Sequence, residues 1–346
     1  MLQPEQIATV QAWMESRGTA AGSGLKADVL HGGHSNITYQ LRDDAGHRWV
    51  LRTPPTSGVL ETAHDMGREH LLMTALSGTM PVPAVIGYES DASLIGTKFL
   101  VMDFVDGLVP RDGKQMLEKL TARQRRTASE SIVDTLAELH RIPPDEVGLR
   151  DLGKPTGYIH RQLTRWKQQW DVTRTADSPD IDTTYQLLLD NIPPQQRTSI
   201  LHGDFRLDNT VLGADGTVAA VLDWELATRG DPLADLASLI LWWTEPGESN
   251  SLGYPGPTSA PDMLTRKQVI ARYVDVTELD IGALDYYLAF VHWRTVCVAQ
   301  GVLSRRLSGA LGEESHVDIA KMRSAVLHHA ETAAEFAAAM RATSCR

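Results

Sequence analysis

The most informative part of the chain is Leu201-His202-Gly203-Asp204-Phe205-Arg206-Leu207-Asp208-Asn209, followed by Val221-Leu222-Asp223-Trp224-Glu225. Four residues separate Asp204 from Asn209, and Asp223 ends an apolar run fourteen positions after Asn209. Carboxylate and amide oxygens are the ligands that a hard cation such as Mg²⁺ prefers. Phosphoryl transfer needs a group that orients the attacking hydroxyl, together with oxygen ligands for a cation that also touches the phosphates. The two aspartates and the asparagine therefore predict phosphoryl-transfer chemistry.

The spacing Asp-x-x-x-x-Asn is that of the catalytic loop in protein kinases. With His-Gly before it and an apolar run ending in Asp-Trp after it, the chain resembles the aminoglycoside phosphotransferase and choline-kinase-like family. The resemblance implies an α+β, protein-kinase-like two-lobed fold that uses ATP and Mg²⁺. It also implies that Asp204 is the catalytic base and that Asn209 and Asp223 bind Mg²⁺. Arg206 lies where protein kinases usually carry a Lys, so we expect it to stabilise the transferred phosphate.

The resemblance continues beyond the motif and covers nearly the whole chain. Residues 223–236, Asp-Trp-Glu-Leu-Ala-Thr-Arg-Gly-Asp-Pro-Leu-Ala-Asp-Leu, are similar to the branch fused to acyl-CoA dehydrogenase modules in some animal proteins. Residues 242–246 and 300–302 fit the same branch, which implies a functional link to an acyl-CoA dehydrogenase. Within this region Asp231 is a good helix N-cap, and we expect Asp235 to brace the catalytic loop.

The periodicity of the chain changes near Asp106. Before it lie strand-like runs and one inserted helix; after it, long amphipathic helical patterns dominate, beginning with residues 121–140. We therefore expect an N-terminal nucleotide-binding lobe at residues 1–105 and a C-terminal catalytic and acceptor-binding lobe at residues 106–346. The expected strands of the first lobe are 27–30, 37–41, 48–52, 85–88 and 98–104, and its helices are 4–17 and 64–76.

The loop His31 to Asn36 joins two of these strands and contains Gly32-Gly33. Backbone N–H groups of such a loop can cover phosphates, and glycine allows the backbone to approach closely. The candidate nucleotide contacts in it are Gly32, Gly33, Ser35 and Asn36. The alternative is that Gly-Gly only forms a hairpin turn.

Arg52 occupies the strand position where kinases have a Lys that pairs with phosphate. Arginine can also hold phosphate oxygens, but with a planar, two-pronged geometry. Glu69, on the expected helix that follows, is its candidate partner; the alternatives are an exposed arginine and a solvated helix carboxylate. Residues 99–105 resemble the last strand and hinge of a kinase lobe, where adenine would bond to the backbone between Asp103 and Val105.

The acceptor side is less informative. Trp166, Trp170, Trp293 and Arg294 are candidates for an acceptor pocket, although aromatic residues at helical spacing more often belong to a core. Nothing indicates an acidic pocket for a polyamine antibiotic. The resemblance to the dehydrogenase-associated branch instead suggests a hydroxyacyl compound or another metabolic alcohol as the small-molecule hydroxyl acceptor.

Composition limits the possible classes of partner. Hydrophobic residues make up 42% and charged residues 22% of the 346 residues, and no run is long and apolar enough to span a membrane. A net charge of −11 argues against nucleic acid as a partner. The first residues do not form a secretory signal, and the two cysteines form no disulfide framework, so a cytoplasmic location is expected.

The sequence thus predicts an enzyme that transfers the γ-phosphoryl group of ATP to a small-molecule hydroxyl. An antibiotic-resistance kinase and a catalytically silent nucleotide-binding module that regulates a partner remain the alternatives. A protein kinase is disfavoured because Asp223 is followed within eight residues by the helix that begins near Asp231, which leaves no room for an activation segment.

Overall fold

The computed structural model describes residues 2–30, 36–54, 66–175, 179–309 and 318–344. The chain forms two compact units. Unit 1 comprises residues 1–107 and 219–227, and unit 2 comprises residues 108–218 and 228–346. The short segment 219–227 thus joins the N-terminal unit, whereas the sequence analysis placed it in the C-terminal lobe. Among the described residues, no helix combines the length and apolar character needed to cross a membrane.

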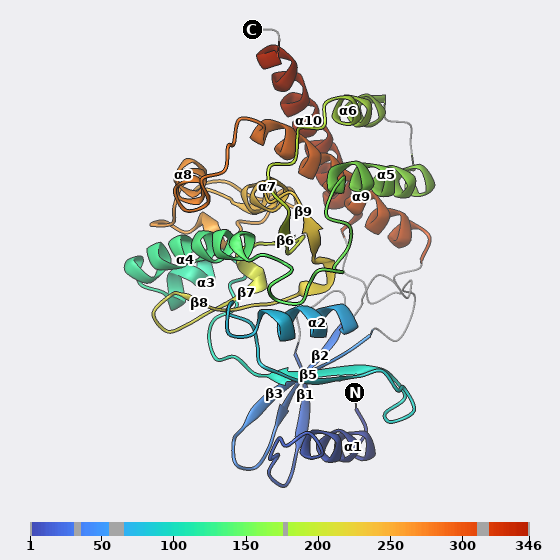
Figure 1. The fold of residues 1–346 in the computed structure, drawn as a ribbon, viewed down its shortest axis with the longest axis vertical. Helices are drawn as coiled ribbons and strands as arrows, with labels where there is room; N and C mark the ends of the chain where they lie inside the picture. The colour runs from blue at the N-terminus through green and yellow to red at the C-terminus, as the bar shows by residue number, and fades with distance from the viewer. Residues whose placement is uncertain (1, 31–35, 55–65, 176–178, 310–317, 345–346) are drawn as a thin grey trace. The chain divides into compact units, whose positions relative to one another are not determined.

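Unit 1 is built on a five-stranded antiparallel sheet with the strand order β1-β2-β3-β5-β4 (Figure 1). Its helix α1 packs through Val10, Trp13 and Met14 against Leu51 and neighbouring apolar side chains of the sheet. The elements of this part are α1 (Pro4–Glu15), β1 (Lys26–Leu30), β2 (Ile37–Arg42), β3 (Arg48–Thr53), α2 (Met66–Leu76), β4 (Val85–Glu89) and β5 (Phe99–Asp103).

Side chains of a strand alternate between the two faces of the sheet, which determines where Arg52 points. In β3, Trp49 and Leu51 are buried in the cluster that includes α1. Arg52 therefore faces the opposite side, where it meets Glu69 of α2. Arg52, which the sequence predicts to pair with phosphate, thus lies on the face of the sheet opposite α1.

The segment 219–227 is anchored to unit 1 by its backbone. The Val221 N–H, at the end of β8 (Val218–Val221), donates to the Pro81 carbonyl at 2.7 Å. Asp223 then adopts a left-handed conformation with φ of 68° and begins the 3-10 turn η2 (Trp224–Leu226). Arg68 Nη1 donates to the Ala227 carbonyl at 2.9 Å, and the Trp224 ring is fully buried. These contacts hold Asp223 in unit 1.

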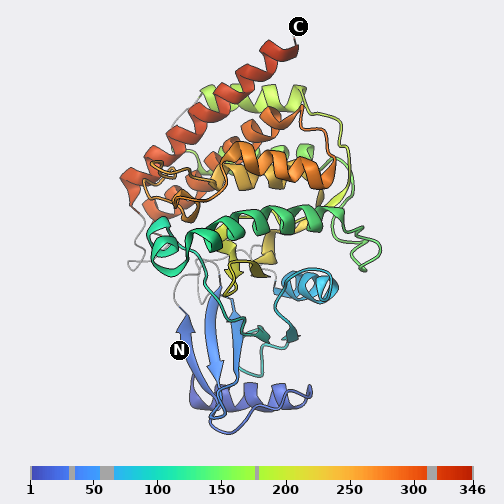
Figure 2. The same ribbon diagram turned by 90° about the vertical axis from the view of Figure 1, so that its left-hand side faces the viewer.

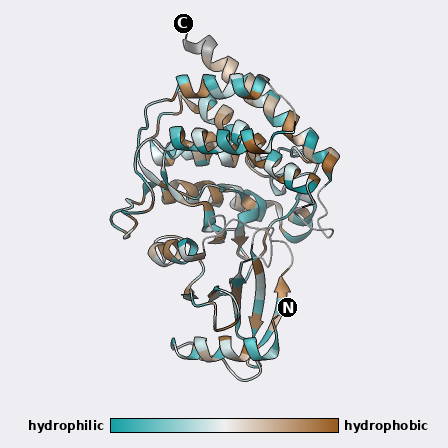
Figure 3. Cartoon of the chain, turned by 90° about the vertical axis from the view of Figure 1, so that its right-hand side faces the viewer, coloured by the Kyte–Doolittle hydropathy of each residue, from teal (hydrophilic) through white to brown (hydrophobic). Residues whose placement is uncertain are grey.

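Unit 2 is mainly helical (Figure 2). The 24-residue helix α9 (Leu284–Leu307) is its centre, with α5, α6, α7 and α10 packed around it. Figure 3 shows hydrophilic and hydrophobic residues alternating along the helices, as expected where each buries one face. The other elements are α3 (Gly113–Lys119), α4 (Ala122–Arg141), α5 (Tyr158–Thr173), α6 (Pro179–Asp190), β6 (Ser199–Leu201), η1 (Leu207–Asn209), β7 (Thr210–Leu212), β9 (Thr228–Gly230), α7 (Leu233–Trp242), η3 (Pro257–Ser259), α8 (Arg266–Thr277) and α10 (Ile319–Ser344).

This packing places two of the four residues expected in the acceptor pocket in the core. Trp170 and Trp293 are 3% and 0% exposed, and Trp293 Nε1 donates to the Ile181 carbonyl at 3.1 Å, so both rings belong to the core. Trp166 is half-buried and bonds Gln162 within its own helix at 2.9 Å. Arg294 points to Ser238 at 3.4 Å. The sequence did not separate core from pocket because both need large apolar side chains.

Candidate active site

The predicted catalytic residues of unit 2 lie together on the loop that follows β6. Gly203 has a φ of 87°, a left-handed conformation that glycine adopts without strain. Asp204 Oδ2 accepts hydrogen bonds from Asn209 Nδ2 at 3.0 Å and from Arg206 Nε at 3.1 Å. The Asn209 amide also donates to the Asp204 carbonyl at 2.9 Å. Both of these bonds use the nitrogen of the amide, which leaves its oxygen for another ligand.

A buried carboxylate, Asp235, holds this loop in place. It lies in the first turn of α7, is 1% exposed, and accepts from the His202 N–H at 2.6 Å and the Gly203 N–H at 3.0 Å. His140 Nε2 lies 3.5 Å from its Oδ2. Burial by itself would raise the pKa of Asp235, but His140 and His202 hold the pKa below its ordinary value. The expectation that Asp235 braces the loop is confirmed by these bonds.

A second set of predicted residues lies in unit 1. Arg52 Nη1 pairs with Glu69 Oε1, and Arg52 Nη2 lies 3.3 Å from Asp223 Oδ1. The side chains of Arg52 and Glu69 are 12% and 2% exposed, whereas that of Asp223 is 33% exposed. Asp223 is therefore the member of this set that a solvent-borne ligand reaches most easily.

Burial determines the charge balance of this set. It raises the pKa of Glu69 to about 7; Arg52 opposes that shift, and the nearby carboxylates of Asp223 and Glu225 add to it. Burial alone would lower the pKa of Arg52, but the charges of Glu69 and Asp223 raise it. Arg52 thus stays cationic, and the pKa of the Glu69 carboxyl beside it lies near neutral pH.

The remaining nucleotide-binding candidates are only partly described. Gly32, Gly33 and Ser35 lie outside the described residues. Asn36 is 6% exposed, and neither polar atom of its side chain has a hydrogen-bond partner within the described chain. At the end of β5 the Asp103 N–H donates to the Ala84 carbonyl at 2.8 Å, whereas no described group accepts from the Val105 N–H. Burial raises the pKa of the Asp103 carboxyl.

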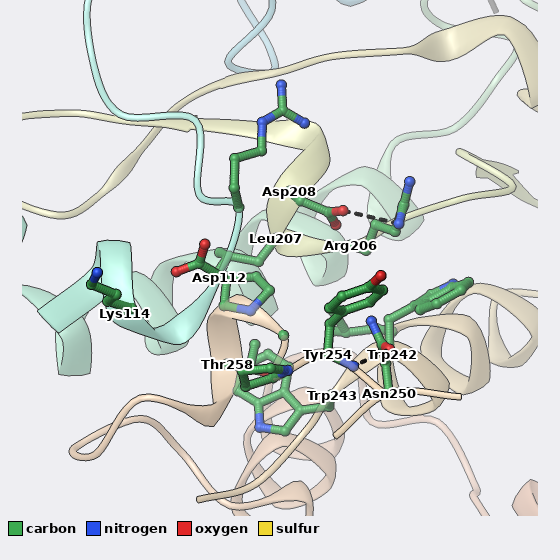
Figure 4. Close-up of a pocket in the computed structure, with 15 residues that line it drawn as sticks. Asp112, Lys114, Arg206, Leu207, Asp208, Trp242, Trp243, Asn250, Tyr254 and Thr258 are labelled. Atoms are coloured by element: carbon green, nitrogen blue, oxygen red, sulfur yellow. Dashed lines mark hydrogen bonds and ion pairs between the residues drawn. The ribbon is translucent and has the colours of Figure 1, made fainter. Parts of the chain in front are cut away.

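Unit 2 also contains a cavity of about 420 Å³ beside the loop that carries Asp204 (Figure 4). Arg206 reaches it from that loop, with Nη1 2.9 Å from Asp208 Oδ2 and its guanidinium 5.1 Å from the Trp242 ring. The lining residues are Arg111, Asp112, Lys114, Arg206, Leu207, Asp208, Leu239, Trp242, Trp243, Asn250, Tyr254, Pro255, Gly256, Pro257 and Thr258. None of the four residues that the sequence proposed for the acceptor pocket is among them.

Comparison with known proteins identifies the family. Residues 26–254 match the model of the phosphotransferase enzyme family APH. The chain belongs to this family. This phosphotransferase is 35% identical over 299 residues to acyl-CoA dehydrogenase family member 11 of Gallus gallus, an alignment that covers 84% of the chain but 38% of that relative. The chain therefore spans well under half the length of the curated relatives that it matches.

Solved structures agree with the family. A putative aminoglycoside phosphotransferase from Ralstonia eutropha JMP134 is 30% identical, with a TM-score of 0.80 over 95% of this chain and 97% of its own. The GDP complex of aminoglycoside 2'-phosphotransferase-IIIa has a TM-score of 0.62 at 15% identity, covering 95% and 99% of the two chains. The prediction of an α+β, protein-kinase-like fold with a small sheet-containing lobe and a helical lobe is confirmed for this phosphotransferase.

Two parts of the site leave no recognisable pattern in the sequence. His140 ends a long amphipathic helix, and a lone histidine there gives no signal that it faces Asp235. The cavity is built from the start of α3 and from the loop between α7 and η3, which is rich in Gly, Pro and Ser and has no periodicity.

The raised pKa of Glu69 predicts a pH effect on stability. Because the pKa in the folded state is about 7, against 4.5 for the ordinary carboxyl, the unfolded chain loses this proton first as pH rises. The contribution of Glu69 to the free energy of unfolding should then be largest below pH 4.5 and decline up to about pH 7. In Glu69→Gln this decline should disappear, as measured by denaturant unfolding at several pH values. Parallel pH profiles for the two proteins would contradict the assignment.

Proposed function

We propose that this phosphotransferase moves the γ-phosphoryl group of ATP, with Mg²⁺, to a hydroxyl of a small molecule. The observation that carries the proposal is the arrangement at Asp204. Its carboxylate is 28% exposed, is oriented by Asn209 and Arg206, and stands on a loop fixed by a buried carboxylate. Such a group can orient an acceptor hydroxyl and take its proton as the oxygen attacks phosphorus. A catalytically silent module would not need Asp204, Asn209 and Asp223 together.

Unit 1 would bind the nucleotide. Arg52 is kept cationic and held by Glu69, so its guanidinium is positioned for phosphate oxygens. The Asn36 side chain and the Val105 N–H, which have no hydrogen-bond partner among the described residues, offer further polar contacts, the second for an adenine edge. The structural neighbour named above was solved with GDP, which supports nucleotide use by this fold.

The proposed ligands fit Mg²⁺ by their chemistry. Asn209 has its amide nitrogen committed to Asp204, so its oxygen remains to bind a cation. Asp223 receives one contact from Arg52 on Oδ1 and is partly open to solvent. Both supply the oxygen donors that Mg²⁺ prefers. When bound, the ion would neutralise charge on the phosphates; the residues of the chain supply orientation and the proton acceptor.

For the acceptor we propose an anionic metabolic alcohol such as a hydroxyacyl compound. Three cationic side chains, Arg111, Lys114 and Arg206, line the cavity. Of its two carboxylates, Asp208 pairs with Arg206, which offsets one of these cations, and Asp112 caps α3 by accepting from the Gln115 N–H at 2.8 Å. The lining therefore carries more positive than negative side chains. Trp242 and Tyr254 add apolar faces. A polycationic antibiotic would meet like charge here, so this lining favours an anionic acceptor over an aminoglycoside.

The names of the curated relatives agree with an acyl acceptor and suggest a functional link to an acyl-CoA dehydrogenase. We place the acceptor in the cavity of unit 2 rather than around Trp166, Trp170, Trp293 and Arg294.

Asp204→Asn should lower kcat by about 10²–10⁴, the range for losing general base catalysis. Asparagine keeps the size of the side chain but accepts no proton, so the KM for ATP should change little. Asp285→Asn, at an exposed position of α9, is the matched control. Turnover of Asp204→Asn close to that of the control would refute the role of Asp204.

Asp223→Asn and Asp223→Ala should separate metal binding from backbone strain. Asparagine tolerates the left-handed backbone at this position, whereas alanine adds about 1–2 kcal/mol of strain. Both variants should lose the Mg²⁺-dependent tightening of ATP binding in calorimetry, and the alanine variant should in addition unfold at a lower temperature. Unchanged affinity for Mg·ATP in the asparagine variant would exclude Asp223 as a metal ligand.

Replacing Arg111 and Lys114 together by Met should raise the KM of an anionic acceptor. Each lost hydrogen bond to a charged group costs about 1.5–3 kcal/mol, or roughly 10–150-fold in affinity. The assay would compare hydroxyacyl-CoA thioesters, free hydroxy acids and an aminoglycoside, with Lys119→Met, exposed at the end of α3, as the control. Efficient phosphorylation of the aminoglycoside, improved by the double substitution, would reverse the choice of acceptor class.

A further inference from the structure

One wall of the cavity is a tight turn from Asn250 to Tyr254. The Asn250 side chain accepts from the N–H groups of Leu252 at 3.0 Å and Tyr254 at 3.1 Å, and the Asn250 N–H donates to the Tyr254 carbonyl at 2.8 Å. Asn250 and Tyr254 both line the cavity. These bonds close the turn on itself but do not tie it to the rest of unit 2.

Helix α10 contacts this turn at two points. Lys321 Nζ donates to the Tyr254 hydroxyl at 2.7 Å and lies 4.0 Å from the centre of its ring. Two helical turns further along, His329 Nε2 lies 2.8 Å from Ser251 Oγ. One contact thus lies near the start of the turn, at Ser251, and the other at its end, at Tyr254. Tyr254 is 52% exposed. A tyrosine this open has little packing to fix its ring.

His329 is itself firmly anchored. It is 3% exposed, and its Nδ1 lies 2.9 Å from Nδ1 of His292 on α9. Burial lowers the pKa of His292 to about 3 and that of His329 to about 4, so the two rings stay neutral near pH 7. Two neutral imidazoles can share one N–H between these nitrogens. Around them α10 docks through buried alanines, among them Ala325, Ala333 and Ala337.

We propose that α10, acting through His329 and Lys321, holds the Asn250–Tyr254 turn in the geometry that forms the acceptor cavity. Both are positioning residues: they touch the wall of the cavity and are not among its lining. A neutral, buried histidine bonded on both ring nitrogens links the central helix α9 to Ser251, and Lys321 fixes the ring that faces the ligand. The inference rests on the proposed function only in that it takes the cavity to be the acceptor site.

The test combines Ser251→Ala with Lys321→Met, which removes both contacts without opening the core. The matched control combines Ser324→Ala with Arg323→Met, at exposed positions on the same helix. Amide hydrogen exchange of the full-length protein, followed by mass spectrometry, reports on residues 246–258 without any ligand. Losing these two hydrogen bonds should speed exchange in this segment by roughly tenfold or more, with the melting temperature nearly unchanged. Lys321→Arg, which keeps a donor, should restore part of the protection.

A kinetic arm relates the turn to the acceptor. With a hydroxyacyl-CoA as the probe, the double variant should raise the KM for that acceptor and leave the KM for ATP unchanged. Exchange in residues 246–258 equal to that of the control would overturn the inference, as would faster exchange with an unchanged acceptor KM. If the wild-type protein phosphorylates no acceptor in the panel, the proposed function has failed, and the exchange result alone decides whether α10 holds the turn.

Discussion

The loop that carries Asp204 depends on one buried carboxylate. Asp235 accepts the backbone N–H groups of His202 and Gly203, the two residues that precede Asp204. Burying a charged carboxylate is costly unless hydrogen bonds and opposite charge compensate for it. Here two backbone donors and the neighbouring His140 supply that compensation. The loop thereby takes its position from α7, which lies in the core of unit 2, instead of from its own short sequence.

In unit 1 ion pairs between Arg52 and two carboxylates hold the polar residues in place. Arg52 stands on a central strand, Glu69 on the helix that covers the same face, and Asp223 on a short segment bonded to this unit by its backbone. Each partner limits the conformations open to the arginine, so the guanidinium is oriented before any ligand binds. This arrangement buries the Glu69 carboxyl, and burial raises its pKa to about 7. The ionised form of Glu69 therefore costs folding free energy, and groups with strongly shifted pKa values cluster at functional sites.

Much of this was open to prediction from the sequence, for identifiable physical reasons. The spacing of Asp204, Asn209 and Asp223 reflects a local loop and the end of a strand. The alternation of side chains in β3 places Arg52 and Leu51 on different faces of the sheet. Both the spacing and the alternation are short-range properties of the chain. The pairing of Arg52 with Glu69 also followed from their successive elements. By contrast, Trp293 lies in the core because most residues of helix α9 are buried, so the pattern of this helix does not separate core from pocket. The cavity combines α3 with the loop after α7, a long-range meeting that no local pattern encodes.

The central claim is that the γ-phosphoryl group of ATP is transferred to a hydroxyl oxygen of a small molecule. The most direct measurement uses ATP labelled with ¹⁸O in the non-bridging oxygens of its γ-phosphate, incubated with the wild-type protein, Mg²⁺ and a panel of hydroxyacyl compounds. Mass spectrometry should find ADP and a phosphorylated acceptor that carries all of the label and retains its own hydroxyl oxygen. Labelled inorganic phosphate as the only product, or nucleotide binding with no turnover of any acceptor, would contradict the account.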